Sequence, residues 1–139
     1  MREPTTRRPT LTGAGKLNVA GMVVAAAGIV VQIVSGSDLF PTIPPGPIIL
    51  LAGAALVALG PWRWTPVVGV VVPLFVVVGG IIAAFVSGSF LDQLTDPGEV
   101  GVFAGSWVQV LGEIAALVAG IVASRQPGRP RVVRARRAR

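Results

Sequence analysis

Four apolar stretches, separated by polar and turn-forming residues, organise this chain. They cover residues 17–34, 47–60, 66–86 and 102–123, and only the last of them contains a charged residue. An α-helix rises about 1.5 Å per residue, so roughly 20 apolar residues cross the ~30 Å hydrocarbon layer of a membrane. The pattern therefore predicts an all-α membrane protein whose residues 17–124 form a four-transmembrane-helix bundle.

The second stretch is the shortest of the four. Its fourteen residues give about 21 Å of helix, unless Ile43 or Trp62 extends it. A re-entrant segment is the alternative, and it would put the two ends of the chain on opposite sides of the membrane. In the third stretch, Pro73 predicts a kink because proline lacks the backbone N–H that the helix needs.

The connections between the stretches carry turn signals. Pro44-Pro45-Gly46 lies in the first connection and Pro97-Gly98 in the third, and both indicate that the chain leaves the membrane there. In the second connection, Trp62 and Trp64 flank Arg63. Two indoles beside a guanidinium are typical of the headgroup boundary, so these three residues predict an interface belt.

Both ends of the chain are polar and basic. Residues 1–16 and 125–139 cannot bury a core, and we expect them to be cytoplasmic tails. The start of the chain also has features of a secretory signal, because Arg7 and Arg8 precede an apolar run with alanines at 25–27. The apolar run continues well past those alanines, which favours a retained first span.

The distribution of charge predicts the orientation. All twelve Lys and Arg residues lie in the two tails and beside Trp62 and Trp64, whereas the first and third connections contain Asp38, Asp92, Asp96 and Glu99 and no base. Basic residues stay on the cytoplasmic side of a membrane protein. We therefore expect a multi-pass protein of the plasma membrane with both termini in the cytoplasm. The eleven Arg against one Lys, with abundant Val, Ala and Gly, indicate a GC-rich genome and a bacterial source.

An internal similarity relates the two halves of the apolar region. With an offset of 52 residues, fifteen of the forty-two positions from Val19 to Gly60 are identical to their equivalents, including Gly28 with Gly80. Two tandem helical hairpins in a parallel repeat are one interpretation, related by an axis along the membrane normal. Chance similarity between Val-, Ala- and Gly-rich helices is the other.

Composition excludes most catalytic chemistry. The chain contains no Cys, His or Tyr. It therefore lacks the usual ligands of zinc, haem and iron–sulfur clusters, and it lacks the bases that activate serine or cysteine nucleophiles. We expect neither an enzyme nor a protein that holds a metal or cofactor.

Glu113 is the only charged residue inside a predicted span, where an ionisable group is costly. It shares a helical face with Gln109 and with the small residues Gly105, Gly112, Ala116 and Gly120, so it is expected to face the bundle. Gln32 lies at similar depth in the first span. These three residues form a candidate intramembrane polar site. It is either a proton- or cation-coupled site or a set of hydrogen bonds that hold helices together.

The carboxyl-terminal tail contains seven Arg residues and no acid. Membrane-surface electrostatics favours contact with anionic lipid headgroups. The residues expected to make it are Arg129, Arg131, Arg134, Arg136, Arg137 and Arg139. Nucleic acid is not the expected partner, because the tail has no aromatic residue that could stack on bases.

Two functions remain after these exclusions. The favoured interpretation is a non-catalytic structural or accessory subunit, packed through small residues against itself or against other membrane protein subunits. The alternative is a small proton- or cation-coupled transporter or channel that uses Glu113.

Overall fold

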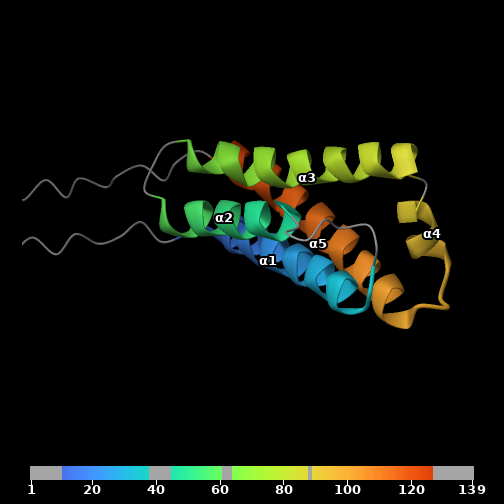
Figure 1. Ribbon diagram of the computed structural model, residues 1–139. Helices are drawn as coiled ribbons and strands as arrows, with labels where there is room; N and C mark the ends of the chain where they lie inside the picture. Colours follow the sequence, from blue (N-terminus) through green and yellow to red (C-terminus); the bar gives the residue numbers. More distant parts are fainter. Residues whose placement is uncertain (1–10, 38–44, 61–63, 88, 127–139) are drawn as a thin grey trace, which may run out of the picture.

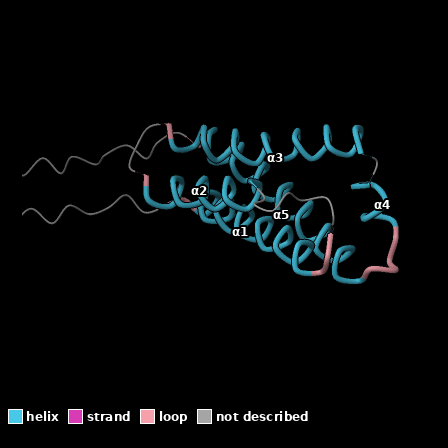
Figure 2. Tube along the Cα trace, viewed as in Figure 1, coloured by secondary structure: helices cyan, strands magenta, loops and turns pink. Residues whose placement is uncertain are grey.

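The computed structural model describes residues 11–37, 45–60, 64–87 and 89–126 (Figure 1). These residues form helices and no strands (Figure 2). The helices are α1 (Gly13–Val34), α2 (Pro45–Leu59), α3 (Thr65–Ser87), α4 (Ser89–Thr95) and α5 (Val100–Arg125).

Three of the helices, α1, α3 and α5, are long and apolar enough to cross a membrane. The expectation of a helical membrane protein is consistent with this arrangement. The fourth apolar helix, α2, has 15 residues, about 22 Å at roughly 1.5 Å per residue. It is shorter than a typical span, so the count of four spans stays a prediction.

The helices extend beyond the predicted stretches. Helix α1 begins at Gly13, four residues before the apolar run, because the Thr12 hydroxyl accepts a hydrogen bond of 3.1 Å from the Gly15 amide and caps the first turn. Helix α5 reaches Arg125. The short helix α4 was not expected, since its residues lie in a stretch that the sequence pattern assigned to a connection.

The long helices run back and forth along one axis (Figure 1). The start of α1, the end of α2, the start of α3 and the end of α5 lie at one end of the molecule, and α4 lies at the other. Helices α1 and α5 are antiparallel and make the most extensive contact, while α2 packs on α1 and α3 packs on α5. Helix α2 begins partway along the bundle, where Gly46 faces the Ile29 side chain of α1.

The apolar core lies between α1, α2 and α5. Its members are Met22, Ala25, Ala26, Ile29, Leu50, Ala54, Val57 and Ala116. Helix α3 contributes less, because its buried residues Thr65, Gly69 and Pro73 all lie in the half nearest its start. A Cβ added to Gly79 or Gly80 would have no other described residue within 4 Å, apart from the chain neighbours and the surrounding backbone of α3.

Candidate functional site

Glu113 lies near the middle of α5 and points into the bundle. Its side chain is 5% exposed, and Gln109, one turn earlier on the same helix, is 6% exposed. The helical period places both on the face that also holds Gly105, Gly112 and Ala116, all of them buried. The burial of Glu113 expected from the sequence is therefore confirmed.

Gln32 of α1 joins this pair. Its Nε2 donates to Gln109 Oε1 at 2.8 Å, and Gln109 Nε2 donates to Glu113 Oε1 at 3.0 Å. Gln32 Nε2 also approaches the Gly28 carbonyl at 3.3 Å. The three predicted polar residues thus form one continuous chain of hydrogen bonds, which we call the amide chain.

The two helices approach closely because glycines line their contact. A Cβ on Gly28 would lie 2.5 Å from the Gln109 amide nitrogen, and a Cβ on Gly105 would lie 2.8 Å from the Gly28 carbonyl oxygen. Further along, a Cβ on Gly112 would lie 2.6 Å from the Ala25 nitrogen. Contact between backbones brings the two glutamines within hydrogen-bonding distance.

One atom of the amide chain lacks a partner. Gln32 is fully buried, yet its Oε1 accepts no hydrogen bond from the residues that the structure describes. Buried carbonyl oxygens are normally paired, and an unpaired one costs on the order of 1–3 kcal/mol. The amide chain therefore ends in an acceptor without a donor.

A second polar contact joins three helices and was not anticipated from the sequence. Asn18 of α1 is buried, and its Nδ2 donates to the Gly69 carbonyl of α3 at 2.7 Å and to the Ala116 carbonyl of α5 at 2.6 Å. The Gly69 carbonyl would ordinarily accept from the residue four positions later, but that residue is Pro73, which has no N–H. Asn18 thus supplies the donor that the proline removes.

Glycine also makes this contact possible. A Cβ on Gly69 would lie 2.6 Å from Asn18 Oδ1, and a Cβ on Gly120 would meet the Gly69 carbonyl oxygen. Two features of the sequence are compatible with this contact, although neither identifies the partner of Asn18. Asn18, Gly21, Ala25, Gly28 and Gln32 follow one helical face, and the proline predicts a free carbonyl four residues earlier.

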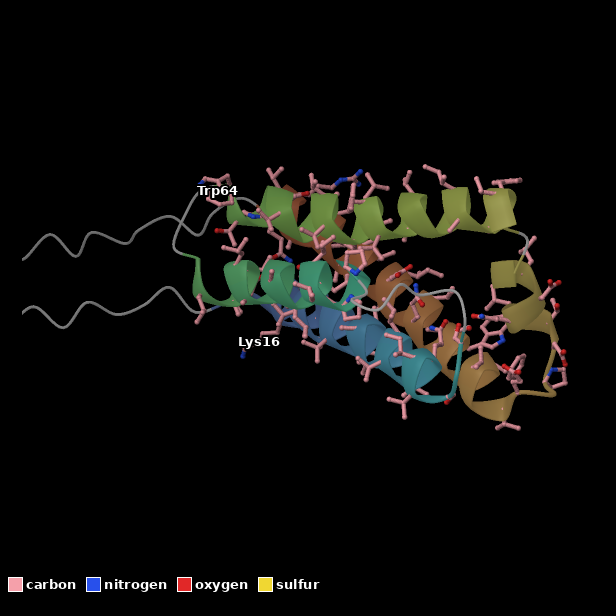
Figure 3. The ribbon with its side chains drawn as sticks, viewed as in Figure 1. Lys16 and Trp64 are labelled. Atoms are coloured by element: carbon pink, nitrogen blue, oxygen red, sulfur yellow. The ribbon has the colours of Figure 1, made fainter. Side chains whose placement is uncertain are left out.

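The residues predicted to lie at the membrane surface are described only in part. Trp64 is half exposed and lies with Lys16 toward the end of the bundle where α1 starts (Figure 3). The other predicted surface residues lie outside the described part of the chain. They are Trp62, Arg63, Arg129, Arg131, Arg134, Arg136, Arg137 and Arg139.

The side chains of this site are two amides and one carboxyl group. Within the described residues, no group of three or more His, Cys, Asp or Glu side chains lies together. The amide chain contains one carboxyl group. Its two side-chain hydrogen bonds, one between α1 and α5 and one within α5, both run from an amide N–H in the direction of that carboxyl group. Hydrogen bonding and proton exchange are the chemistry that these groups support.

Comparison with known proteins identifies no relative: no family model, no curated protein and no solved structure matches the chain.

Proposed function

We propose that this chain is a four-span protein of the bacterial cell membrane that acts as a non-catalytic structural or accessory subunit. One observation carries the proposal: the large buried polar side chains of the long helices form hydrogen bonds with one another or with neighbouring helices. These side chains are those of Asn18, Gln32, Gln109 and Glu113. Polar groups used in this way hold helices together.

The lateral surface supports an environment of lipid and other membrane helices. Large aliphatic and aromatic side chains are exposed along all the long helices. Examples are Val23, Val30, Leu51, Leu56, Val71, Phe75, Ile82, Phe85, Leu111 and Val118. A surface this apolar is stable in hydrocarbon, and it offers contacts to other subunits or to a second copy of the chain.

The positions of charged residues support the proposed orientation. Among the described residues, Lys16 and Arg125 lie at the end of the bundle where α1 starts. Asp92, Asp96 and Glu99 lie in or beside α4, at the opposite end. With basic residues on the cytoplasmic side, both termini are cytoplasmic and α4 is outside.

Two architectural parts of the proposal depend on α2 and on the internal similarity. Helix α2 packs along α1 and counts as the second span if Gly60 and the residues after it complete the crossing. The parallel repeat draws support from α1 and α3, whose first residues are 52 positions apart. Its copies have diverged, because α2 has 15 residues and α5 has 26.

Affinity capture tests the structural role. The tagged protein, extracted from its native membrane in mild detergent, should retain one defined set of membrane subunits or a second copy of itself. Glu113→Gln should retain the same set, because the oxygen of a glutamine amide can accept the hydrogen bond that Gln109 donates to Glu113. A wild-type protein that runs as a lone monomer, with no co-purifying membrane protein, would contradict the proposal.

A proton- or cation-coupled transporter or channel is the second candidate function. The observation that favours it is the continuous amide chain that leads from Gln32, in the last turns of α1, to Glu113 near the middle of α5. Vesicles containing the purified protein and an internal pH dye should then acidify faster than empty vesicles when a proton gradient is applied. Glu113→Gln should abolish the difference, and equal rates for loaded and empty vesicles would exclude proton movement.

The carboxyl-terminal tail is proposed to bind anionic lipid headgroups, each basic residue near the surface contributing about 1 kcal/mol. Full-length protein in nanodiscs should capture anionic vesicles at low salt and release them as salt screens the attraction. A variant lacking residues 128–139 should stay folded and capture fewer vesicles. Equal capture by both proteins would remove this role.

A further inference from the structure

The amide chain has a direction. Gln32 donates to Gln109, and Gln109 donates to Glu113, so both hydrogen bonds between these side chains run toward the carboxyl group. A primary amide donates from its nitrogen and accepts at its oxygen. The direction at Gln109 therefore fixes the direction at Gln32, and it leaves the buried Gln32 Oε1 without a donor.

An ionised carboxyl group only accepts hydrogen bonds, and the direction seen here suits it. A protonated carboxyl also donates. To accept from it, Gln109 must turn its oxygen toward Glu113, which turns its N–H groups toward Gln32. Gln32 must then turn its own oxygen toward Gln109, and in doing so it gives up the 3.3 Å approach to the Gly28 carbonyl. The reversed chain supplies Gln32 Oε1 with the donor that it lacks.

We propose that Gln32, Gln109 and Glu113 form a hydrogen-bond relay that responds to a proton. Protonation of Glu113 reverses the donor and acceptor orientation of both glutamine amides, so that the response reaches Gln32. This inference rests on the hydrogen-bonded polar site used in both candidate functions. It adds that the ligand of the site is a proton and that the response appears on a different helix from the one that binds it.

Among the described residues, no other charged group lies close enough to Glu113 to determine the direction of the hydrogen bonds in the amide chain. Glu99, just before α5, and Arg125, at its end, are fourteen and twelve residues away from Glu113, roughly 21 and 18 Å at ~1.5 Å per residue. Of the helices packed against α5, α1 carries only Lys16, which is exposed in its first turn, α3 carries no charged residue, and α4 carries only the exposed Asp92. Asp96 is exposed between α4 and α5, and Asp38 and Arg63 lie outside the described residues.

The relay ends close to a contact between α4 and the residues that follow α1. The Ser37 amide donates to the Gln32 backbone carbonyl at 3.0 Å and closes the end of α1, where Gly36 has a φ of 89°. The Ser37 hydroxyl in turn accepts a 2.8 Å bond from Gln93 of α4. A change of donor and acceptor at the Gln32 side chain therefore occurs close to the segment that joins the end of α1 to α4 through Ser37.

Side-chain amide NMR tests the relay on the full chain in lipid nanodiscs. The sequence has four glutamines and one asparagine, so five side-chain amide groups can be assigned by single substitutions. Infrared spectroscopy follows the protonated carboxyl band of Glu113 over the same pH series, up to the alkaline limit at which the bundle stays folded. The signals of Gln32 and Gln109 should change with the midpoint of that band.

Asn18 is the internal control. Its amide is buried like that of Gln32, but it donates to two backbone carbonyls, which cannot become donors. Its signal should not follow the Glu113 midpoint. Gln109→Leu should abolish the response of Gln32 while the carboxyl band still titrates. Gln32→Leu should leave the response of Gln109 intact, which guards against misreading a poorly folded Gln109 variant.

The relay is overturned if Gln32 does not change through the Glu113 transition, or if its response survives Gln109→Leu. It is also overturned if the carboxyl band shows no transition anywhere in the range in which the bundle is folded. The outcomes at Gln32 and Gln109 are separate from the functional tests, because subunit capture and vesicle acidification are measured without reference to the amide signals.

Discussion

Replacement of Gly28 by alanine is the most direct test of the contact between α1 and α5. The added Cβ would lie 2.5 Å from the Gln109 nitrogen, whereas ordinary contacts of a Cβ begin near 3.4 Å. The helices must therefore separate by about 1 Å, which stretches the 2.8 Å bond between Gln32 and Gln109 beyond the usual ~3.2 Å limit.

Two costs follow from that separation. Overpacking of a well-packed contact costs about 1–3 kcal/mol, and an interhelical hydrogen bond in a membrane protein contributes about 0.6 kcal/mol. We expect Gly28→Ala to destabilise the bundle by about 2–3 kcal/mol. Since ~1.4 kcal/mol is a factor of ten, this lowers the folding equilibrium constant by roughly 30- to 150-fold.

Gly80→Ala is the matched control. Gly80 is the equivalent of Gly28 in the internal similarity, but outside the surrounding backbone of α3 no described residue lies within 4 Å of its added Cβ. Because alanine favours a helix over glycine by up to ~1 kcal/mol, this variant should be as stable as the natural protein or slightly more stable.

The assay can use the absence of natural cysteines. Dyes on Lys16→Cys and Arg125→Cys, both exposed at one end of the bundle, report the separation of α1 and α5 by energy transfer during unfolding in mixed detergent micelles. Equal midpoints for Gly28→Ala and Gly80→Ala would refute the reasoning, because they would mean that the backbone contact at Gly28 does not limit stability.

Three further predictions concern other parts of the molecule. Asn18→Ala should destabilise the bundle by about 1–2 kcal/mol, and by less in a Pro73→Ala background, because the restored N–H at position 73 can bond to the Gly69 carbonyl. Unfolding of the natural protein, the two single variants and the double variant measures this coupling, and an equal cost in both backgrounds would contradict it. Glu113→Gln should preserve the folded species in size-exclusion chromatography and Glu113→Lys should not, because lysine buries an unpaired charge. In the natural protein, an infrared band of the Glu113 carboxyl that is constant from about pH 5 to about pH 9 indicates a structural role, and a band that titrates in this range indicates a coupling role. A cysteine at position 96 should react with an impermeant thiol reagent on intact cells, whereas a cysteine at position 16 should react only after the membrane is opened. The reverse result would contradict the proposed orientation.

The strongest signals in the sequence were those of length and helical period. The apolar runs predicted α1, α3 and α5 to within a few residues, because an uninterrupted run of this length has no other stable conformation in lipid. The period of 3.6 residues likewise placed Glu113 and Gln109 on one buried face. These features are local, so a single stretch of sequence is sufficient to infer them.

Features that depend on contact between helices were harder to predict. Nothing near Asn18 in the sequence indicates that its amide reaches α3, since Gly69 lies 51 residues later. The pairing of Gln32 with Gln109 was open for the same reason, although both residues were singled out. The ends of α1 and the position of α4 depended on caps and side-chain contacts such as Thr12 with Gly15 and Gln93 with Ser37.

The pairing of the first long helix with the last has a consequence for biosynthesis. Gln32 and Gln109 are 77 residues apart, and a ribosome adds roughly 5–20 residues per second, so α1 waits on the order of 4 to 15 s before its partner emerges. During that interval Asn18 and Gln32 have no donor or acceptor from α5 in a medium that provides none. A nascent chain stalled before α5 is therefore the species that membrane insertion factors must shelter and membrane proteases should recognise.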